Sequence, residues 1–277
     1  MKFVDFRTGD KSASIRMLFP GWKRGESVAF LSPHDDDVVL GAGILVRAVL
    51  AAGGQPHILI FCKGDAGYST PAARRTIVRT RRREALAAYA TLGVDPADIH
   101  FFGLPDLSLM AYVNRKVPAR AGVLDRFLRL LRRHRAGRVV FSSPHFENWD
   151  HTAVYYVGMY ASPQAGDPIL ADLGDPSPVS SFLVYSVWGD FAPPAEGNDA
   201  LRADVGILAG RKDSEIVRKA LQAFGSQSKV LENTAAMPGD RPTGPGGRLE
   251  LYQRARVREP IDYGPYFERL RKVNRKA

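Results

Sequence analysis

The residues best suited to chemistry lie in two short segments, each of which follows an apolar, β-prone run and precedes a helix-like pattern. In the first segment, residues 28–43, one histidine and three carboxylates occupy positions 34 to 37. In the second, residues 139–154, His145 and His151 lie among acidic side chains. Three adjacent carboxylates are costly to hold together unless a cation, water or a helix N-terminus compensates them. The two segments therefore indicate the two halves of a metal site.

A plausible ligand set can be drawn from these segments. A catalytic zinc ion typically takes three protein ligands from histidine and carboxylate side chains and keeps one position for water. His34, one of the acids Asp35–Asp37, and His151 would supply such a set, and a second carboxylate would then serve as general base. The alternative is that the three acids cap the following helix and that His151 forms a hydrogen bond in the core.

The remaining histidines have a different setting. Of the six histidines in the chain, only His34, His145 and His151 lie in acid-rich loops after predicted strands. The other three lie in or beside predicted helices and strands, which favours a structural role; they are His57, His100 and His134.

The elements that must position the motifs alternate between strand-like and helix-like patterns. Apolar runs predict strands at residues 26–31, 57–62, 99–102, 138–141 and 182–188. Helical patterns occupy residues 38–52, 72–92, 121–134, 152–160 and 213–224. This alternation predicts a Rossmann-like α/β fold with a mostly parallel sheet flanked by helices. Because parallel strands finish at the same edge of a sheet, the two motifs can converge there.

The segments outside this pattern are expected to be peripheral to it. We expect one domain over residues 1–277 with a core at about residues 27–230. Residues 1–26 look like an irregular lead-in, and residues 162–180 and 237–247 look like loops rich in proline and glycine. Residues 231–277 are expected to form a loop and a basic tail, a small irregular extension of the fold.

Composition limits the classes of protein and partner. The 277 residues carry a net charge of +10 and a single cysteine, Cys62, which excludes an internal disulfide. No apolar window is long enough to span a bilayer, and residues 1–23 lack the apolar stretch of a secretory signal, so a cytoplasmic location is expected. The positive charge would suit an anionic partner. The basic runs contain no nucleic-acid motif, and we expect no nucleic-acid partner.

Both motifs resemble those of the LmbE/PIG-L family of metal-dependent N-deacetylases. The family's first motif, His-Pro-Asp-Asp-Glu, corresponds to His34-Asp-Asp-Asp-Val38, and its second, His-Pro-Asp-His, corresponds to Asn148-Trp-Asp-His151. The resemblance implies that His34, Asp37 and His151 bind a metal ion, Zn²⁺ or Fe²⁺. It also implies that Asp36 is the general base.

Further segments resemble the family in the same order along the chain, over roughly residues 27–230. They are the turn at residues 63–67, Arg81-Arg-Arg-Glu84, Leu92-Gly-Val94, residues 102–106 and Ser226-Gln227. The resemblance implies that Arg81 and Asp106 contact the substrate, although a surface cation and a turn-forming residue are the respective alternatives. Trp149, between two matched residues, is either a platform for a sugar ring or a packing residue.

Two departures from the family pattern bear on mechanism. The proline and glutamate of the first motif are Asp35 and Val38 here, and the first histidine of the second motif is Asn148. An asparagine amide can donate to an oxyanion but cannot act as a general acid near neutral pH. Either Asp36 handles both proton transfers or His145 takes the missing role; we favour Asp36 because His145 lies three residues before the matched position.

The resemblance implies a hydrolase that removes an N-acetyl or other N-acyl group from an amino sugar or sugar conjugate. Metal-activated water would attack the amide carbonyl, with Asp36 as base and Asn148 or a backbone N–H stabilising the oxyanion. The alternative is a catalytically degenerate protein of the same fold that binds a sugar or an anionic ligand. A binuclear phosphoesterase would need more histidine and asparagine ligands than the motifs provide.

Overall fold

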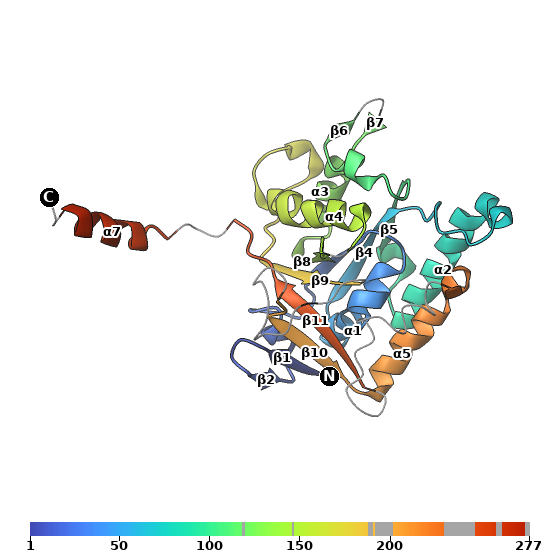
Figure 1. The fold of residues 1–277 in the computed structure, drawn as a ribbon, viewed down its shortest axis with the longest axis horizontal. Helices are drawn as coiled ribbons and strands as arrows, with labels where there is room; N and C mark the ends of the chain where they lie inside the picture. Colours follow the sequence, from blue (N-terminus) through green and yellow to red (C-terminus); the bar gives the residue numbers. More distant parts are fainter. Residues whose placement is uncertain are drawn as a thin grey trace.

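A computed structural model of the protein describes residues 1–117, 120–145, 147–187, 191, 202–229, 247–258 and 262–274. In this part of the chain a nine-stranded sheet forms the centre, with the strand order β2-β1-β10-β11-β9-β8-β3-β4-β5 (Figure 1). One half of the sheet is parallel and consists of β3 (Ser27–Ser32), β4 (Gln55–Cys62), β5 (Ile99–Leu104), β8 (Ala136–Ser142) and β9 (Ser181–Tyr185). The other half is antiparallel and consists of β1 (Lys2–Asp5), β2 (Lys11–Ser12), β10 (Val205–Ala209) and β11 (Arg248–Arg254).

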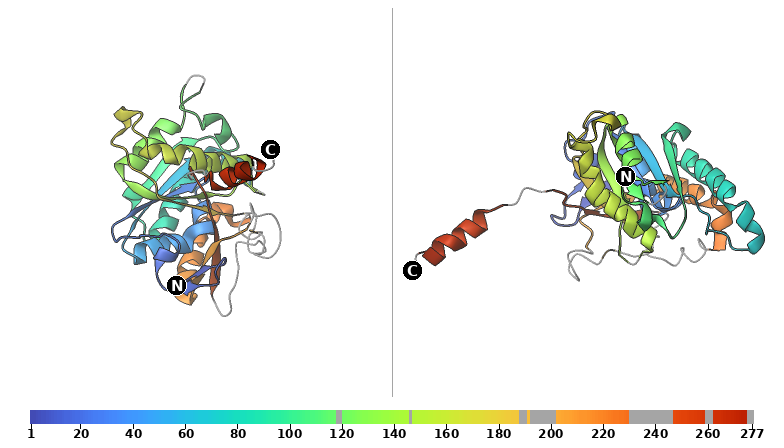
Figure 2. Two further views of the ribbon diagram at one scale, coloured as in Figure 1. Left: turned by 90° about the vertical axis from the view of Figure 1, so that its left-hand side faces the viewer. Right: turned by 90° about the horizontal axis from the view of Figure 1, so that it is seen from above.

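Helices cover both faces of the sheet, as Figures 1 and 2 show. On one face lie α1 (Asp37–Ala51), α2 (Ile77–Leu92) and α5 (Arg211–Gln222). On the other face lie α3 (Leu124–Arg133) and α4 (Trp149–Tyr156), which a π-helical turn, Val157–Ala161, continues. A small hairpin of β6 (Lys116–Val117) and β7 (Arg120–Ala121) stands apart from the sheet. The helix α7 (Gly264–Asn274) projects from the body, and Phe267 on it is 57% exposed.

The parallel strands are apolar on both sides because helices cover both sides. In β3, Val28 and Phe30 belong to the core beneath α1, α2 and α5, whereas Ala29 and Leu31 belong to the core beneath α3 and α4. All four side chains are at most 1% exposed. The predicted strands and helices are therefore confirmed, with ends shifted by a few residues, and so is the α/β fold class.

The antiparallel half of the sheet corrects two expectations. Residues 1–26 are not merely an irregular lead-in, because β1 pairs with β10 inside the sheet. The segment 231–277 is not confined to a loop and tail, because β11 lies between β10 and β9.

The sequence of β11 does not predict a strand in the sheet, because a polar residue is more deeply buried than the leucines beside it. Glu250 is 1% exposed, whereas its neighbours Leu249 and Leu251 are only half-buried. Its carboxylate accepts hydrogen bonds from the backbone N–H groups of Ile44 (2.8 Å) and Leu45 (3.1 Å). These N–H groups lie just beyond a kink in α1 at Ala42 (φ −142°, ψ 16°), where the helical hydrogen-bond ladder is interrupted. A buried acid thus completes the helix that begins with Asp37.

The predicted loop at residues 162–180 follows an irregular path with two 3₁₀ turns, Ser162–Gly166 and Ala171–Leu173. The buried guanidinium of Arg132, from α3, donates to six backbone carbonyls of this loop, between Gln164 and Gly174. The predicted loop at residues 237–247 lies, except for its last residue, outside the described residues. Within those residues, no helix combines the length and apolar character needed to cross a membrane.

Candidate metal centre

The two sequence motifs emerge at the same edge of the sheet. β3 ends at Ser32, and four residues separate it from Asp37, where α1 begins; β8 ends at Ser142, before α4 begins at Trp149. Because β3 and β8 are neighbouring parallel strands, both loops leave the sheet at its C-terminal edge. There His34, Asp37 and His151 each offer a ligand atom, and these atoms lie within 4.8 Å of one another.

The first loop is held by hydrogen bonds within its own sequence. The hydroxyl of Ser32, which is fully buried, donates to the carbonyl of His34 and accepts from the N–H of Val38 at 3.3 Å. The N–H of His34 donates to Oδ2 of Asp37 at 2.7 Å. The turn therefore fixes His34 and Asp37 relative to each other before any ligand binds.

Asp37 is the centre of the cluster. Its Oδ2 lies 3.2 Å from Nδ1 of His34 and 3.4 Å from Nε2 of His151. His151 is fully buried, and neither of its ring nitrogens has a hydrogen-bond partner among the described residues. An unpartnered buried nitrogen is costly, and a cation held between these three side chains would satisfy it.

Two further carboxylates lie beside ring nitrogens of the two histidines. Oε2 of Glu147 lies 3.3 Å from Nδ1 of His151, and Oδ2 of Asp150 lies 3.1 Å from Nε2 of His34. Asp150 also accepts from the N–H groups of Leu107 (2.6 Å) and Leu109 (3.0 Å). A carboxylate behind each imidazole is the usual arrangement around metal-binding histidines, because it fixes the tautomer and the ring orientation.

The roles of Glu147 and Asp150 were not predicted from the sequence. Glu147 lies four residues before His151, and Asp150 lies inside the second motif. The general rule that a carboxylate supports a metal-binding histidine was the signal that could have identified them.

The electrostatics of the cluster favour positive charge. Burial alone would lower the pKa of His34, but its hydrogen bonds to Asp150 and Asp37 and the nearby carboxylates raise that pKa well above its usual value. Burial would raise the pKa of Asp37, yet the His151 and His34 rings outweigh it and hold the pKa well below its usual range. Two imidazoles and one carboxylate in such a field suit a divalent ion such as Zn²⁺ or Fe²⁺.

The other two acids of the first motif are compensated by Arg81, from α2. Nε of Arg81 lies 3.0 Å from Oδ2 of Asp35, its Nη2 donates to the second oxygen of Asp35, and Nη2 lies 3.2 Å from Oδ2 of Asp36. Asp36 occupies the N-cap position of α1, but its side chain forms no capping hydrogen bond. The acids are therefore held by histidines and an arginine rather than by the helix they precede.

The structure places the predicted substrate-contacting residues in different settings. Arg81 is 3% exposed and is committed to Asp35 and Asp36. Asp106 accepts from the N–H groups of Gly64 (2.8 Å) and Ala66 (2.9 Å), which is the turn-forming alternative, although its carboxylate also lies near His34. Trp149 is 72% exposed at the start of α4.

The two candidates for the missing second-motif histidine also differ. Oδ1 of Asn148 caps α4 by accepting from the N–H groups of Asp150 (2.9 Å) and His151 (3.4 Å), which leaves Nδ2 as the donor of this side chain. The backbone N–H of His145 donates to Oγ of Ser143 at 3.1 Å. Within the described residues, the His145 ring takes part in none of the hydrogen bonds or ion pairs of the centre.

Other segments that resemble the family form hydrogen bonds and packing contacts near the site. Glu84 accepts from the N–H and the hydroxyl of Ser226 at 2.8 and 2.6 Å. Nε2 of Gln227 donates to the carbonyl of Gly67 at 2.7 Å. Gly64 has a φ of +77° and its α-carbon faces the stem of Arg81, so the turn at residues 63–67 packs directly on that arginine.

Comparison with known proteins finds a matching family model and similar folds. The model of the PIG-L family, described as GlcNAc-PI de-N-acetylase, matches residues 29–162, which include both motifs. No curated protein matches the chain in sequence. Among solved structures, N,N′-diacetylchitobiose deacetylase from Pyrococcus horikoshii, complexed with its inhibitor, has a TM-score of 0.65 at 17% identity, over 88% of this chain and 87% of that one.

Two other similar structures extend the comparison. A conserved protein from Thermus thermophilus has a TM-score of 0.61 at 24% identity, over 86% of this chain and 97% of that one. A 4-carboxy-2-hydroxymuconate hydratase from Pseudomonas putida has a TM-score of 0.55 at 19% identity, over 86% of this chain and 100% of that one. These similarities establish a shared fold, and because a fold hosts more than one reaction, the chemistry must be argued from the site.

Proposed function

This chain belongs to the PIG-L (LmbE-like) family, whose model it matches over residues 29–162, and on this premise we propose that it is a metal-dependent N-deacetylase. Its substrate would be an amino sugar or sugar conjugate carrying an N-acetyl or other N-acyl group. The observation that carries the proposal is the convergence of His34, Asp37 and His151, whose ligand atoms lie within 4.8 Å of one another.

The donor set supports a metal ion as the cofactor. The unpartnered ring nitrogens of His151, with Glu147 behind them, are best explained by a cation that completes the cluster. A bound Zn²⁺ or Fe²⁺ ion would polarise the amide carbonyl and lower the pKa of a water molecule. His34, Asp37 and His151 would hold the ion, and Asp150 and Glu147 would orient the two imidazoles.

Asp36 is proposed as the general base and then the general acid. It adjoins the ligand Asp37, and its side chain is 12% exposed, so solvent and substrate can reach it. Asp36 would accept a proton from water as the water oxygen bonds to the carbonyl carbon. It would return that proton to the amide nitrogen as the C–N bond breaks, so the products are a carboxylate and a free amine.

Arg81 acts in this scheme as a positioning residue rather than a substrate contact. Its guanidinium is buried against Asp35 and lies 3.2 Å from Asp36, so it would hold the base in place and keep its charge compensated. Burial would lower the pKa of Arg81, but the charges of Asp36 and Asp35 hold it above its usual value. Arg81 therefore stays a cation throughout the cycle.

Asn148 and Trp149 would complete the substrate side of the centre. Nδ2 of Asn148 is the donor available to the negative charge that develops on the carbonyl oxygen. The exposed indole of Trp149 offers a flat apolar surface against which a sugar ring can stack. The net charge of +10 favours an anionic conjugate among the possible cytoplasmic substrates.

The alternative is a binding protein of this fold that holds the metal without turnover, which the replacement of two motif residues by Val38 and Asn148 would favour. The two candidates are separated by measuring metal content and acetate release from a panel of N-acetylglucosamine conjugates, for wild type and Asp36→Asn. We expect stoichiometric metal in both proteins and a loss in kcat of about 10²- to 10⁴-fold in the variant.

A matched control removes a carboxylate elsewhere. Asp125 is partly exposed and pairs with Arg115 on the surface, so Asp125→Asn should release acetate at the wild-type rate. Metal bound in full by the wild-type protein, with no acetate released from any conjugate, would mean either a binding protein or a substrate outside this panel, and the panel would then be widened.

A further inference from the structure

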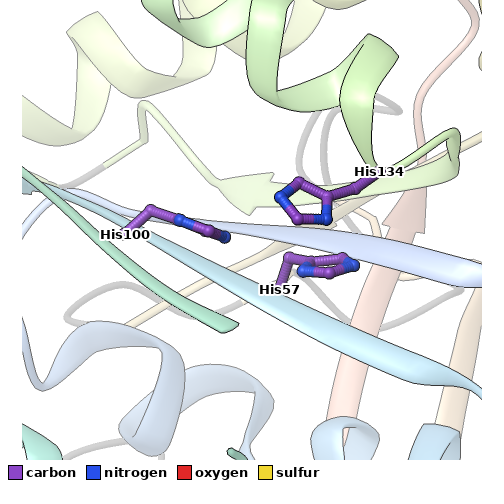
Figure 3. A group of neighbouring side chains, drawn as sticks. All are labelled: His57, His100 and His134. Carbon is purple, nitrogen blue, oxygen red and sulfur yellow. The ribbon is translucent and has the colours of Figure 1, made fainter. Parts of the chain in front are cut away.

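A second group of histidines lies at the opposite edge of the sheet, away from the centre described above. His57 is near the start of β4, His100 is near the start of β5, and His134 is the C-cap residue of α3. The three rings point toward one another (Figure 3), and a ligand atom of each lies within 4.8 Å of the others. Their ring centroids are 4.0 Å (His57 to His134), 5.1 Å (His100 to His134) and 5.9 Å (His57 to His100) apart.

Several ring nitrogens of these histidines form no hydrogen bond with the described residues around them. His57 is 1% exposed, and both of its ring nitrogens lack a hydrogen-bond partner in the described residues. Nε2 of His100 is buried and unpartnered in the same way. A neutral imidazole always carries one N–H donor and one acceptor, so burying them without partners is unfavourable. Apolar side chains would fill this position at lower cost if packing were its only role.

One carboxylate is held beside the cluster. Oδ1 of Asp98 lies 3.2 Å from Nδ1 of His57, within ion-pair distance, but not aligned as a hydrogen bond. Nε2 of Gln55 donates to both oxygens of Asp98, at 3.0 and 3.1 Å, and so anchors the carboxylate there. A small rotation of His57 would let Asp98 accept its Nδ1 proton, which leaves the lone pair on Nε2 free.

The imidazoles are in the protonation state that metal binding requires. Burial, followed by the neighbouring His134 and His100 rings, lowers the pKa of His57 to about 3. Burial and His134 lower the pKa of His100 to about 4, with the cations Arg126 and Arg133 adding to the effect. Near neutral pH no proton has to be displaced before a metal ion binds. The two arginines oppose a cation, and Asp98 compensates them in part.

We propose that His57, His100 and His134 form a second metal site, for a divalent transition-metal ion such as Zn²⁺, Co²⁺ or Ni²⁺. Imidazole nitrogens suit these ions, whereas Mg²⁺ and Ca²⁺ prefer oxygen ligands. Asp98 orients His57, and water completes the coordination.

Occupation of the site would require the side chains to rotate. Zn–N bonds of about 2.0–2.1 Å in a tetrahedral site place the ligand nitrogens about 3.3 Å apart, so the rings must turn inward from their present spacing. His134, at the end of a helix and partly exposed, has the freedom to do so. The bound ion would tie the end of α3 to β4 and β5, which makes the site structural rather than catalytic.

The experiment titrates metal-free protein with Co²⁺ and Zn²⁺ while stoichiometry and melting temperature are measured. Three proteins are compared: wild type, His34→Gln/His151→Gln, and His100→Gln/His134→Gln. We expect the His34→Gln/His151→Gln variant to keep one equivalent and a metal-induced rise in Tm of about 5 °C at a hundredfold excess over Kd. The His100→Gln/His134→Gln variant should lose that equivalent and that rise, and it should keep its deacetylase activity.

The outcome does not depend on the proposed deacetylase activity, because the His34→Gln/His151→Gln variant lacks the other centre. X-ray absorption of that variant, loaded with one equivalent of Co²⁺, gives an independent readout even if the other variant misfolds. Three imidazole nitrogens bound to cobalt would support the site. Metal binding unaffected by the His100 and His134 substitutions, or cobalt surrounded by oxygen alone, would overturn it.

Discussion

The two histidine clusters lie at opposite ends of the parallel half of the sheet, one after β3 and β8 and the other near the start of β4 and β5, and they differ in the charges around each ring. At the C-terminal edge, His34 and His151 share Asp37, and each has a further carboxylate behind it. At the N-terminal edge, His57, His100 and His134 face one another, with Asp98 as the one carboxylate at ion-pair distance in the described residues. Burial alone would lower the pKa of both His34 and His57, yet the pKa of His34 is raised and that of His57 is lowered to about 3.

The difference shows that neighbouring charge, rather than burial, decides what each cluster can bind. The carboxylates make the first cluster a negatively charged site, in which a cation is favoured by charge as well as by lone pairs. The second cluster is a neutral set of nitrogen donors, which is selective for metals with an affinity for imidazole. We therefore expect a metal ion to be essential for chemistry at the first edge and to act on stability at the second.

Among the substitutions that test the difference between the two clusters, Asp37→Ala should cause the largest loss of activity. Oδ2 of Asp37 lies near ring nitrogens of both His34 and His151, so its loss removes a ligand and the charge shared by the two rings. Losing several kcal/mol of transition-state stabilisation should lower acetate release by about 10³-fold or more. The control is His100→Gln/His134→Gln, which should stay within about twofold of wild type because it leaves the C-terminal edge unchanged. An equal loss in both variants would contradict the separation of the two clusters.

The parallel strands and the residues of the first cluster could be predicted from the sequence, but the antiparallel half of the sheet could not. The parallel strands were predictable because apolar runs such as residues 57–62 alternate with helical patterns. The antiparallel half was not predictable, because β11 buries the polar residue Glu250 more deeply than its leucines. The Glu250 carboxylate accepts hydrogen bonds from backbone N–H groups beside a kink in α1, about 200 residues away in the sequence.

The same limit applies to side-chain contacts. The motifs placed His34, one of the acids Asp35–Asp37 and His151 together, and the family resemblance singled out Asp37, but the ion pair of Arg81 with Asp35 depends on how α2 packs against the first loop. The N-terminal cluster was invisible for a similar reason: its three histidines come from separate elements and carry no motif. The register of β4 with β5, in which Leu59 is opposite His100, places His57 and His100 on one face, and the packing of α3 adds His134.

The second prediction concerns the carboxylate behind His151. Glu147→Gln keeps an oxygen for the N–H of Val187, which donates to Oε1 at 2.8 Å, but it removes the negative charge beside Nδ1 of His151. We expect metal affinity at the C-terminal edge to fall by about 10- to 100-fold, as isothermal titration of metal-free protein would measure. The N-terminal cluster should bind metal with unchanged affinity.

Glu250→Gln is the matched control for this variant, since Glu250 is equally buried but bonds to the backbone of α1. Burial raises the pKa of Glu250, and its substitution should lower the free energy of unfolding by about 1–3 kcal/mol while metal affinity stays near wild type. If Glu250→Gln weakened metal binding as much as Glu147→Gln, the effect would be general loosening rather than loss of the charge behind His151.

The smallest effect is the pH dependence of stability that the N-terminal cluster contributes. The pKa of His57 is about 3 and that of His100 about 4 in the folded protein, against about 6.5 in an unfolded chain. Between these values the unfolded state binds more protons than the folded state. The free energy of unfolding therefore falls as the pH falls from about 7 toward 4. Allowing for the partial exposure of His100, the loss should be about 1 kcal/mol between pH 7 and pH 6.

Urea unfolding of metal-free protein at pH 6 and pH 7 measures the total slope, to which His34 contributes with the opposite sign because its pKa is raised in the folded protein. The contribution of His57 is therefore the difference between wild type and His57→Leu, which should be about 0.7 kcal/mol between pH 7 and pH 6. A wild-type slope that His57→Leu does not change would mean that the rings are not held neutral, and the contrast between the two edges of the sheet would fail.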